Sequence, residues 1–190
     1  MKLYGSSTSP FVRRLRVFLS GLDHEFININ IYEEEGRSIL KSINPALKIP
    51  MLVDGEKVIF DSRIIFQYLN QAYVKDAWTI NDDNNLTLIN AANDSYVELF
   101  LLEKSGIDTS QDALFFNLQH ERIQSTLDVL NTSASQGSFD TWNFASISLF
   151  CLIDWALFRS LNTFDAYPHL YTFYQNNLDR PIVKSTDPRD

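Results

Sequence analysis

The sequence predicts two folded regions: a small α/β unit followed by an all-helical one. Residues 1–74 alternate short β-prone runs with amphipathic helical patterns, whereas residues 85–190 contain only helical periodicities. The mostly polar residues between these ranges form the expected connection. We therefore place the domain boundary within that connection.

The α/β unit begins with a strand, a polar loop and a helix. A strand at residues 2–4 leads through Ser6–Ser9 into a helix that starts at Pro10 and stops near Gly21. A serine N-cap followed by proline at the first helical position is a strong start signal. Residues 25–31 alternate apolar and polar side chains, which is typical of a strand.

A tight hairpin forms the second half of this unit. Asp54-Gly55 between two short apolar runs is among the best local hairpin signals. Ser62, placed before a periodic apolar run, is a good helix N-cap. The predicted elements here are a short helix ending before Asn44, strands at 51–53 and 57–60, and a helix from Ser62 to Leu69.

The second region is predicted to be helical throughout. Its most apolar helix contains Cys151, Trp155 and Phe158, which we interpret as core residues. The expected helices span approximately residues 86–104, 112–130, 143–158 and 170–178.

Composition excludes several classes of function. The chain has 190 residues and a formal net charge of −8, which argues against general binding to phosphate backbones. The cluster Arg13, Arg14 and Arg16 is interpreted as a solvated helix face. The three histidines are scattered without ligand-spaced acidic or thiol partners, so we expect no metal site.

Cysteine use and hydropathy suggest a cytoplasmic protein. A single cysteine, Cys151, allows no internal disulfide. The first residues lack the apolar run of a signal peptide. The longest apolar stretch, 147–158, is too short to cross a bilayer and contains Asp154.

Two polar features are carried to one end of the predicted sheet. A helix N-terminus and the Ser62 hydroxyl attract a carboxylate, and the adjacent Asp61 can take an ammonium group. The pair therefore suits the amino-acid head of a ligand, with the backbone of Lys48-Ile49 beside it. The alternative is a plain hairpin, a capped helix and a surface aspartate.

Ser9 is the sharpest local candidate. It stands where a strand runs into a helix, so its hydroxyl and the first helical N–H groups would face a bound group. A thiol there becomes more acidic, and lowering its pKa from ~8.5 to ~6.5 requires about 2.7 kcal/mol. No base lies close in sequence, so Ser9 is not expected to be a covalent nucleophile. The alternative role is an N-cap alone.

Three motifs in this order resemble the glutathione S-transferase family. They are Thr8-Ser9-Pro10-Phe11, then Asn44-Pro45 with Lys48-Ile49-Pro50, then Phe60-Asp61-Ser62. The chain is similar to bacterial and plant members whose active-site residue is a serine. The resemblance covers the whole chain and implies a thioredoxin-like N-terminal domain followed by an all-helical glutathione-transferase C-terminal domain.

The resemblance also implies roles for individual residues. Ser9 would donate a hydrogen bond to the glutathione sulfur and hold it as a thiolate. The backbone of Ile49, with Pro50 in cis, would pair with the cysteinyl part, and Asp61 and Ser62 would grip the γ-glutamyl head. The implied glutathione-binding residues are Ser9, Lys48, Ile49, Asp61 and Ser62.

A second-substrate pocket is expected above the thiolate. Its candidates are Phe11 from the first region and Tyr96 and Phe100, one helical turn apart, from the second. The alternative is that these aromatic residues belong to the core. Family members usually begin the core helix of the second domain with Ser or Thr, followed three residues later by Asp. Here Asn143 and Ser146 stand at these positions, so Asn143 is the expected cap and Ser146 replaces the carboxylate.

The function expected from this resemblance is enzymatic. Glutathione would be the co-substrate, without a metal, and its thiolate would add to small apolar electrophiles or reduce peroxides, in a homodimer that binds neither nucleic acid nor membrane. One alternative is a non-catalytic glutathione-transferase-fold interaction module. Another is a thiol–disulfide oxidoreductase, although that chemistry normally needs a cysteine where Ser9 stands.

Overall fold

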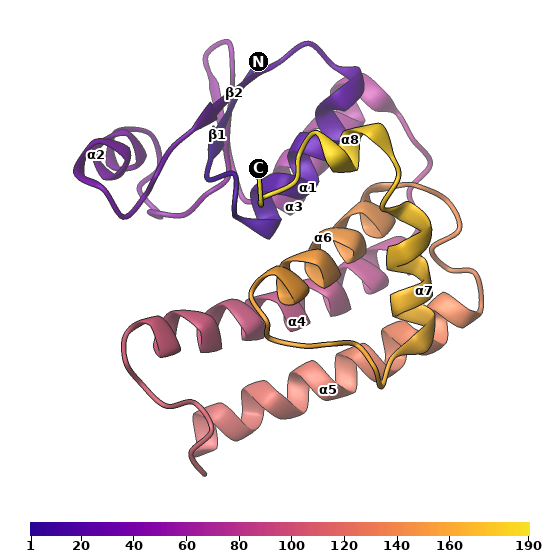
Figure 1. Cartoon of the computed structure of the whole chain (residues 1–190). Helices are drawn as coiled ribbons and strands as arrows, with labels where there is room; N and C mark the ends of the chain where they lie inside the picture. The colour runs from indigo at the N-terminus through magenta and orange to yellow at the C-terminus, as the bar shows by residue number, and fades with distance from the viewer. The chain divides into compact units, whose positions relative to one another are not determined.

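The computed structural model describes all 190 residues and groups them into two compact units (Figure 1). Unit 1 contains Met1–Ala77 together with Leu178–Asp190, and unit 2 contains Trp78–Asn177. The predicted domains were residues 1–74 and 85–190. The contact grouping assigns the C-terminal segment Leu178–Asp190 to unit 1, whereas the sequence prediction placed it with the helical region.

Unit 1 is built on a four-stranded mixed sheet. The strands lie in the order β2-β1-β3-β4, with β1 parallel to β2 and the other neighbours antiparallel. The strands are β1 (Lys2–Gly5), β2 (Glu25–Asn28), β3 (Met51–Asp54) and β4 (Lys57–Phe60).

The register of three strands brings several loops to one edge of the sheet. Tyr4 lies opposite Met51, and Met51 lies opposite Phe60. The segments that follow β1, precede β3 and follow β4 therefore leave the sheet at the same edge.

Helices pack on this sheet in the predicted order (Figure 1). Ile29, Leu40 and Met51 form one buried cluster, with Ile27 and Ile31 packed against it. The apolar residues of the alternating stretch 25–31 therefore pack together on one side. The helices are α1 (Pro10–Phe18), η1 (Leu19–Gly21), α2 (Glu34–Ile43), α3 (Ser62–Leu69), η2 (Asn70–Val74) and α8 (Pro181–Lys184).

The strand β2 ends earlier than its alternating pattern suggests. The Asn30 carbonyl accepts from Glu33 N, and the Asn30 side chain accepts from Tyr32 N, so the backbone turns there. Gly36 packs on this turn, because a Cβ at that position would lie 2.1 Å from the Asn30 oxygen. Close helix packing requires glycine at this point.

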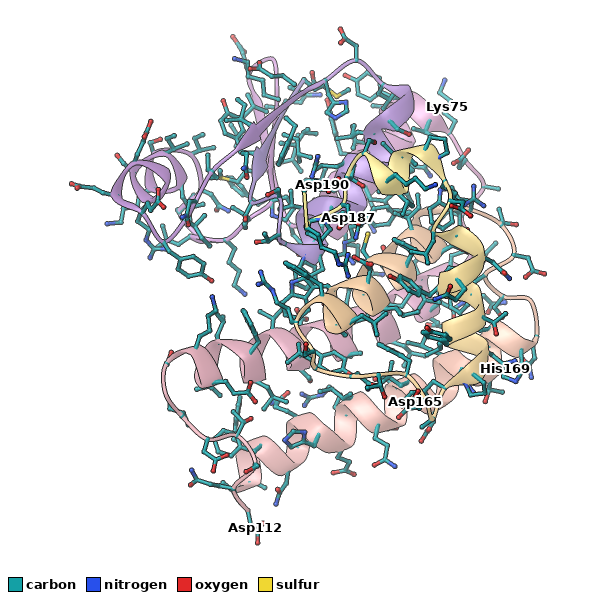
Figure 2. The ribbon with its side chains drawn as sticks, in the orientation of Figure 1. Lys75, Asp112, Asp165, His169, Asp187 and Asp190 are labelled. Carbon is teal, nitrogen blue, oxygen red and sulfur yellow. The ribbon has the colours of Figure 1, made fainter.

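The C-terminal segment is tied to α1 by a buried arginine. Arg13 Nη2 donates to the Val183 carbonyl at 3.0 Å and Nε donates to Thr186 Oγ1 at 3.4 Å. Figure 1 shows α8 beside α1, and Asp187, labelled in Figure 2, follows α8. Arg13 is only 3% exposed and Arg14 only 2%, so their predicted placement on a solvated face is wrong.

Unit 2 is all-helical, as predicted. Within it α4 packs along α5 and α6, and α7 packs against α5 and α6. Cys151 and Trp155 are buried in α6, which confirms them as core residues. The helices are α4 (Ile80–Lys104), α5 (Leu114–Ser135), α6 (Phe144–Phe158) and α7 (Pro168–Asn177).

Capping explains where two of these helices begin. Thr79 and Asp82 form a reciprocal capping box, so α4 starts earlier than the predicted residue 86. Asn143 caps α6, as predicted, by accepting from Ala145 N at 3.0 Å and Ser146 N at 3.1 Å. The Ser146 hydroxyl instead donates to the Thr141 carbonyl at 2.5 Å.

Candidate functional site

Three polar segments of unit 1 meet at one sheet edge. The strand register carries the loop before Ser9, the Ile49–Pro50 loop and the Asp61–Ser62 pair to this edge. The sequence places these segments in separate motifs, and the β1-β3-β4 ladder is what brings them together. We define this region as the edge site.

Ser9 is the N-cap of α1. Its Oγ accepts from Val12 N at 3.4 Å, and its backbone N–H donates to the Ser6 carbonyl at 3.1 Å. The Ser9 hydroxyl proton has no acceptor within the chain. The loop before it is also pinned, because Ser7 N donates to Asn28 Oδ1 at 2.9 Å. Ser9 can therefore accept from its own helix and still donate to a ligand.

The Ile49 backbone is exposed to pairing with a ligand. The Ile49–Pro50 peptide bond is cis, as the resemblance implies. Neither the N–H nor the carbonyl of Ile49 has a hydrogen-bond partner in the chain. The Lys48 side chain is exposed, while its carbonyl accepts from Asn44 Nδ2 at 2.7 Å.

Asn44 organises the loop that carries Lys48 and Ile49. It is 1% exposed, and its Oδ1 accepts from Ala46 N at 2.9 Å while its Nδ2 holds the Lys48 carbonyl. One buried amide thus bonds two backbone groups of the loop, the Ala46 N–H and the Lys48 carbonyl. Sequence reasoning used Asn44 only as part of a motif, and its amide beside a proline was the available signal.

Asp61, not Ser62, caps α3. Asp61 Oδ1 accepts from Arg63 N at 2.8 Å and from Ile64 N at 3.3 Å, and its φ of 65° lies in the left-handed region that aspartate tolerates. Ser62 is then the first helical residue, which corrects its predicted role as cap. Asp61 Oδ2 has no partner in the chain, so the carboxylate keeps one oxygen for a cation.

Arg14 reaches Ser62 from α1. Its Nη2 donates to Ser62 Oγ, and both residues are buried. The Arg14 guanidinium carbon also lies 4.9 Å from the centroid of the Phe11 ring. Nothing local in the sequence marked Arg14, because its partner lies 48 residues away.

The expected second-substrate residues are divided between the units. Phe11 lies in unit 1 against Arg14, whereas Tyr96 and Phe100 lie on α4. Tyr96 is 4% exposed, its hydroxyl accepts from Asn162 Nδ2 at 2.7 Å, and burial raises its pKa to about 12. The Phe100 ring meets Trp155 edge to face, with centroids 5.4 Å apart. Their shared pocket stays a prediction.

No group of three or more His, Cys, Asp or Glu side chains is arranged to hold a metal ion. None of the helices combines the length and apolar character that crossing a membrane requires.

The fold and the edge site define a class of protein: a thioredoxin-like unit with a cis-proline loop, followed by an all-helical unit. Residues 3–77 match the glutathione S-transferase N-terminal domain. The GST-like protein YibF of Escherichia coli K12 is 32% identical over 99% of this chain and 98% of its own. The chain belongs to the glutathione S-transferase family, which confirms the resemblance.

Other relatives agree with this membership. Glutathione S-transferase 1 of Zea mays is 26% identical, covering 97% of this chain and 94% of its own. A Methylobacillus flagellatus KT glutathione S-transferase, solved with glutathione bound, superposes with a TM-score of 0.86 at 22% identity over 98% of both chains. A Pseudomonas fluorescens Pf-5 member, solved with S-(propanoic acid)-glutathione, gives 0.81 at 23% identity over 98% of both chains. These structures establish the predicted fold class.

Proposed function

We propose that this chain binds reduced glutathione along the edge site and adds its thiolate to small apolar electrophiles. The observation that carries the proposal is the strand register, which gathers a hydroxyl donor, an unpaired peptide group and a carboxylate at one edge. Family membership and the bound glutathione of the similar structures support it.

Each end of the tripeptide has a matching group. Asp61 Oδ2 accepts from the γ-glutamyl ammonium, and the Ser62 hydroxyl meets the α-carboxylate at the start of α3. The Ile49 N–H and carbonyl pair with the cysteinyl backbone in the antiparallel manner. Lys48 lies next to the peptide.

Ser9 then acts on the sulfur. The thiol proton leaves to solvent, and the Ser9 hydroxyl donates to the resulting anion at the N-terminus of α1. The thiolate electron pair forms the new S–C bond, and the electrophile either expels its leaving group as an anion or takes up a proton after addition. Phe11, Tyr96 and Phe100 are the proposed apolar contacts for the electrophile.

The proposal is tested by replacing Ser9 with alanine. Calorimetry should find that Ser9→Ala still binds glutathione, whereas kcat with an activated aryl halide near pH 7 falls about a hundredfold, as for loss of one oxyanion donor. The rate should recover as pH rises, because hydroxide then supplies the thiolate that Ser9 no longer stabilises.

A hydroxyl of the same loop provides the matched control. Thr8 Oγ1 lies 3.1 Å from Ser6 Oγ and does not cap α1, so Thr8→Ala should leave kcat unchanged. If the wild-type protein neither binds glutathione nor turns over any of a panel of electrophiles, the non-catalytic interaction module becomes the better explanation.

The proposed assembly is a cytoplasmic homodimer. The single cysteine is buried in α6, which fits a compartment without disulfide chemistry. Sedimentation should give twice the 21.9 kDa chain mass, and a monomer at all concentrations would refute the dimer.

A further inference from the structure

One aromatic ring of unit 2 is contacted by two cations. Lys104 Nζ lies 5.2 Å from the centroid of the Phe100 ring, and the Arg159 guanidinium carbon lies 5.0 Å from the same centroid. The Arg159 carbon is also 4.4 Å from the centroid of the Phe158 ring. Lys104 stands one turn after Phe100 on α4, whereas Arg159 follows the last residue of α6. We call these four residues the cation–aromatic cluster.

The cluster concentrates positive charge in an acidic part of the chain. Unit 2 contains twelve Asp and Glu residues but only three Lys and Arg residues, and two of those three contact the Phe100 ring. The third, Arg122, donates to a serine of α4 and a glutamine of α5. Lys104 forms no ion pair with a carboxylate of the chain. The adjacent Glu103 accepts from a threonine hydroxyl at 2.7 Å instead.

Helix stability accounts for only part of this arrangement. A cation at the end of a helix is favoured by the helix dipole, and a cation over a ring is attracted by its π electrons. Two cations at one ring also repel each other, and an anion beside them relieves that repulsion. Arg159 has five N–H donors in a planar fork, so it can keep its contacts within the protein and still bind an anion. Phe100 and Phe158 are half-buried, so part of their ring surface can contact a ligand.

We propose that the cation–aromatic cluster binds an anionic group of the second substrate, so that the preferred electrophiles carry a carboxylate beside an apolar reactive part. Phe100 contacts the apolar part, and Lys104 and Arg159 pair with the carboxylate. The inference rests on the proposed function and adds the charge of the substrate to it. Lys104 and Arg159 are therefore specificity-determining residues.

The experiment compares two aryl chlorides that differ in charge. One is 4-chloro-3-nitrobenzoate, and the other is the neutral 4-chloro-3-nitrobenzamide. In both, the glutathione sulfur forms a bond to the ring carbon that bears chlorine, and chloride leaves with the electron pair of the broken bond. Each kcat/KM is divided by the rate constant of the same uncatalysed reaction with glutathione, which removes the difference in intrinsic reactivity.

The wild type should prefer the benzoate by about tenfold in this ratio, because two cations act on its carboxylate. Lys104→Met and Arg159→Met should each lower the preference by about threefold, and the double variant should abolish it. Turnover of the benzamide should change by less than about twofold in all three variants. The preference should also weaken as salt rises from about 0.05 M to about 0.5 M, since partly exposed ion pairs are screened.

Lys57→Met is the matched control. Lys57 Nζ lies 5.2 Å from the centroid of the Tyr68 ring, which is the same contact at the same distance. Lys57 belongs to unit 1 and lies at the opposite end of β4 from Phe60 and the edge site. Lys57→Met should therefore keep the benzoate preference of the wild type.

Calorimetry gives a readout that does not depend on turnover. The glutathione conjugate of the benzoate should bind the wild type about tenfold more tightly than the conjugate of the benzamide. Lys104→Met should reduce this difference by about threefold, and Lys104→Arg, which keeps the charge, should retain most of it.

Failure of this inference is distinguishable from failure of the proposed function. If the wild type turns over both chlorides in proportion to their uncatalysed rates, or if the double variant keeps the benzoate preference, the inference is wrong and the transferase activity stands. If the wild type turns over neither chloride and binds neither conjugate, the proposed function is wrong, and this inference with it. Lys104 is exposed, so Lys104→Met decides the outcome alone if Arg159→Met does not fold.

Discussion

The two helices that begin at the edge site are capped by different residues, and the two caps leave different groups available to a ligand. At α1 the cap is Ser9, whose hydroxyl accepts from Val12 N and keeps its proton for a ligand. At α3 the cap is Asp61, which uses one carboxylate oxygen for two N–H groups and keeps the other. The first terminus thus offers a donor to an anion, and the second offers an acceptor to a cation.

This difference shows how capping chemistry selects the ligand group. Each cap uses part of its hydrogen-bonding capacity on the N–H groups of its own helix, and only the remaining proton or lone pair can bond to a ligand. Ser62, which does not cap because Asp61 does, accepts a hydrogen bond from Arg14 Nη2. The arrangement of donors and acceptor therefore matches a thiolate at α1 and an amino-acid head at α3.

The largest expected effect comes from replacing Ser9, the cap of α1, with aspartate, the residue type that caps α3. Ser9→Asp should preserve stability, because aspartate caps as well as serine does, whereas Ser9→Ala should lose about 1 kcal/mol. Its rate should nevertheless fall further than that of Ser9→Ala, by more than about a hundredfold, because the carboxylate raises the pKa of a bound thiol. Thermal unfolding ranks the two variants by stability, and kcat with glutathione ranks them by rate.

The prediction is specific because the two variants should rank in opposite order for stability and for rate. Ser9→Asp should be the more stable variant and the slower enzyme. A Ser9→Asp protein as active as the wild type would mean that this hydroxyl serves its helix alone.

The next effect comes from removing the charge at α3 while keeping its cap. Asp61→Asn retains an acceptor oxygen and tolerates the positive φ of 65°, so Tm should change little. Glutathione should bind about tenfold more weakly, since the ammonium loses its ionic partner. Asp61→Ala should lose that affinity and also about 1 kcal/mol of stability.

A ligand without the amino group tests this directly. Deaminated glutathione, with hydrogen in place of the α-amino group, should bind the wild type and Asp61→Asn equally well. If Asp61→Asn binds glutathione as tightly as the wild type, the carboxylate is a cap and nothing more.

Sequence reasoning reached the elements whose signals are local. The Ser9-Pro10 start of α1, the Asp54-Gly55 hairpin and the Asn143 cap each depend on a few neighbouring residues, and all three appear in the structure. The Thr79-to-Asp82 capping box was also present in the sequence, and its omission moved the predicted start of α4.

What the sequence could not provide depends on distant partners. Arg13 is buried because Val183, 170 residues later, returns to α1, and no periodicity in the helix encodes that contact. The choice between Asp61 and Ser62 as cap was likewise undetermined locally, since both types cap well. Arg14, which engages Ser62, belongs to another helix.

The smallest expected effect lies at the far end of α3. Asp54 accepts from Tyr68 Oη at 2.6 Å and from Tyr73 Oη, and these hydrogen bonds, that of Tyr68 first, hold the pKa of Asp54 below its usual value. A carboxyl with a lowered pKa in the folded state stabilises it above about pH 4, and this contribution disappears as pH falls through the folded pKa.

Because Asp54 is only partly buried, Asp54→Asn should lower Tm at pH 7 by only about 1–2 °C and reduce the loss of Tm between pH 5 and 3. Glu56→Gln, in the same hairpin but outside this contact, should keep the wild-type pH dependence. Glutathione affinity should be unchanged in both variants, since Asp54 lies at the opposite end of β3 from Met51 and the edge site. A loss of affinity in Asp54→Asn would mean that α3 transmits strain from one end to the other, and the two ends would then have to be treated as one unit.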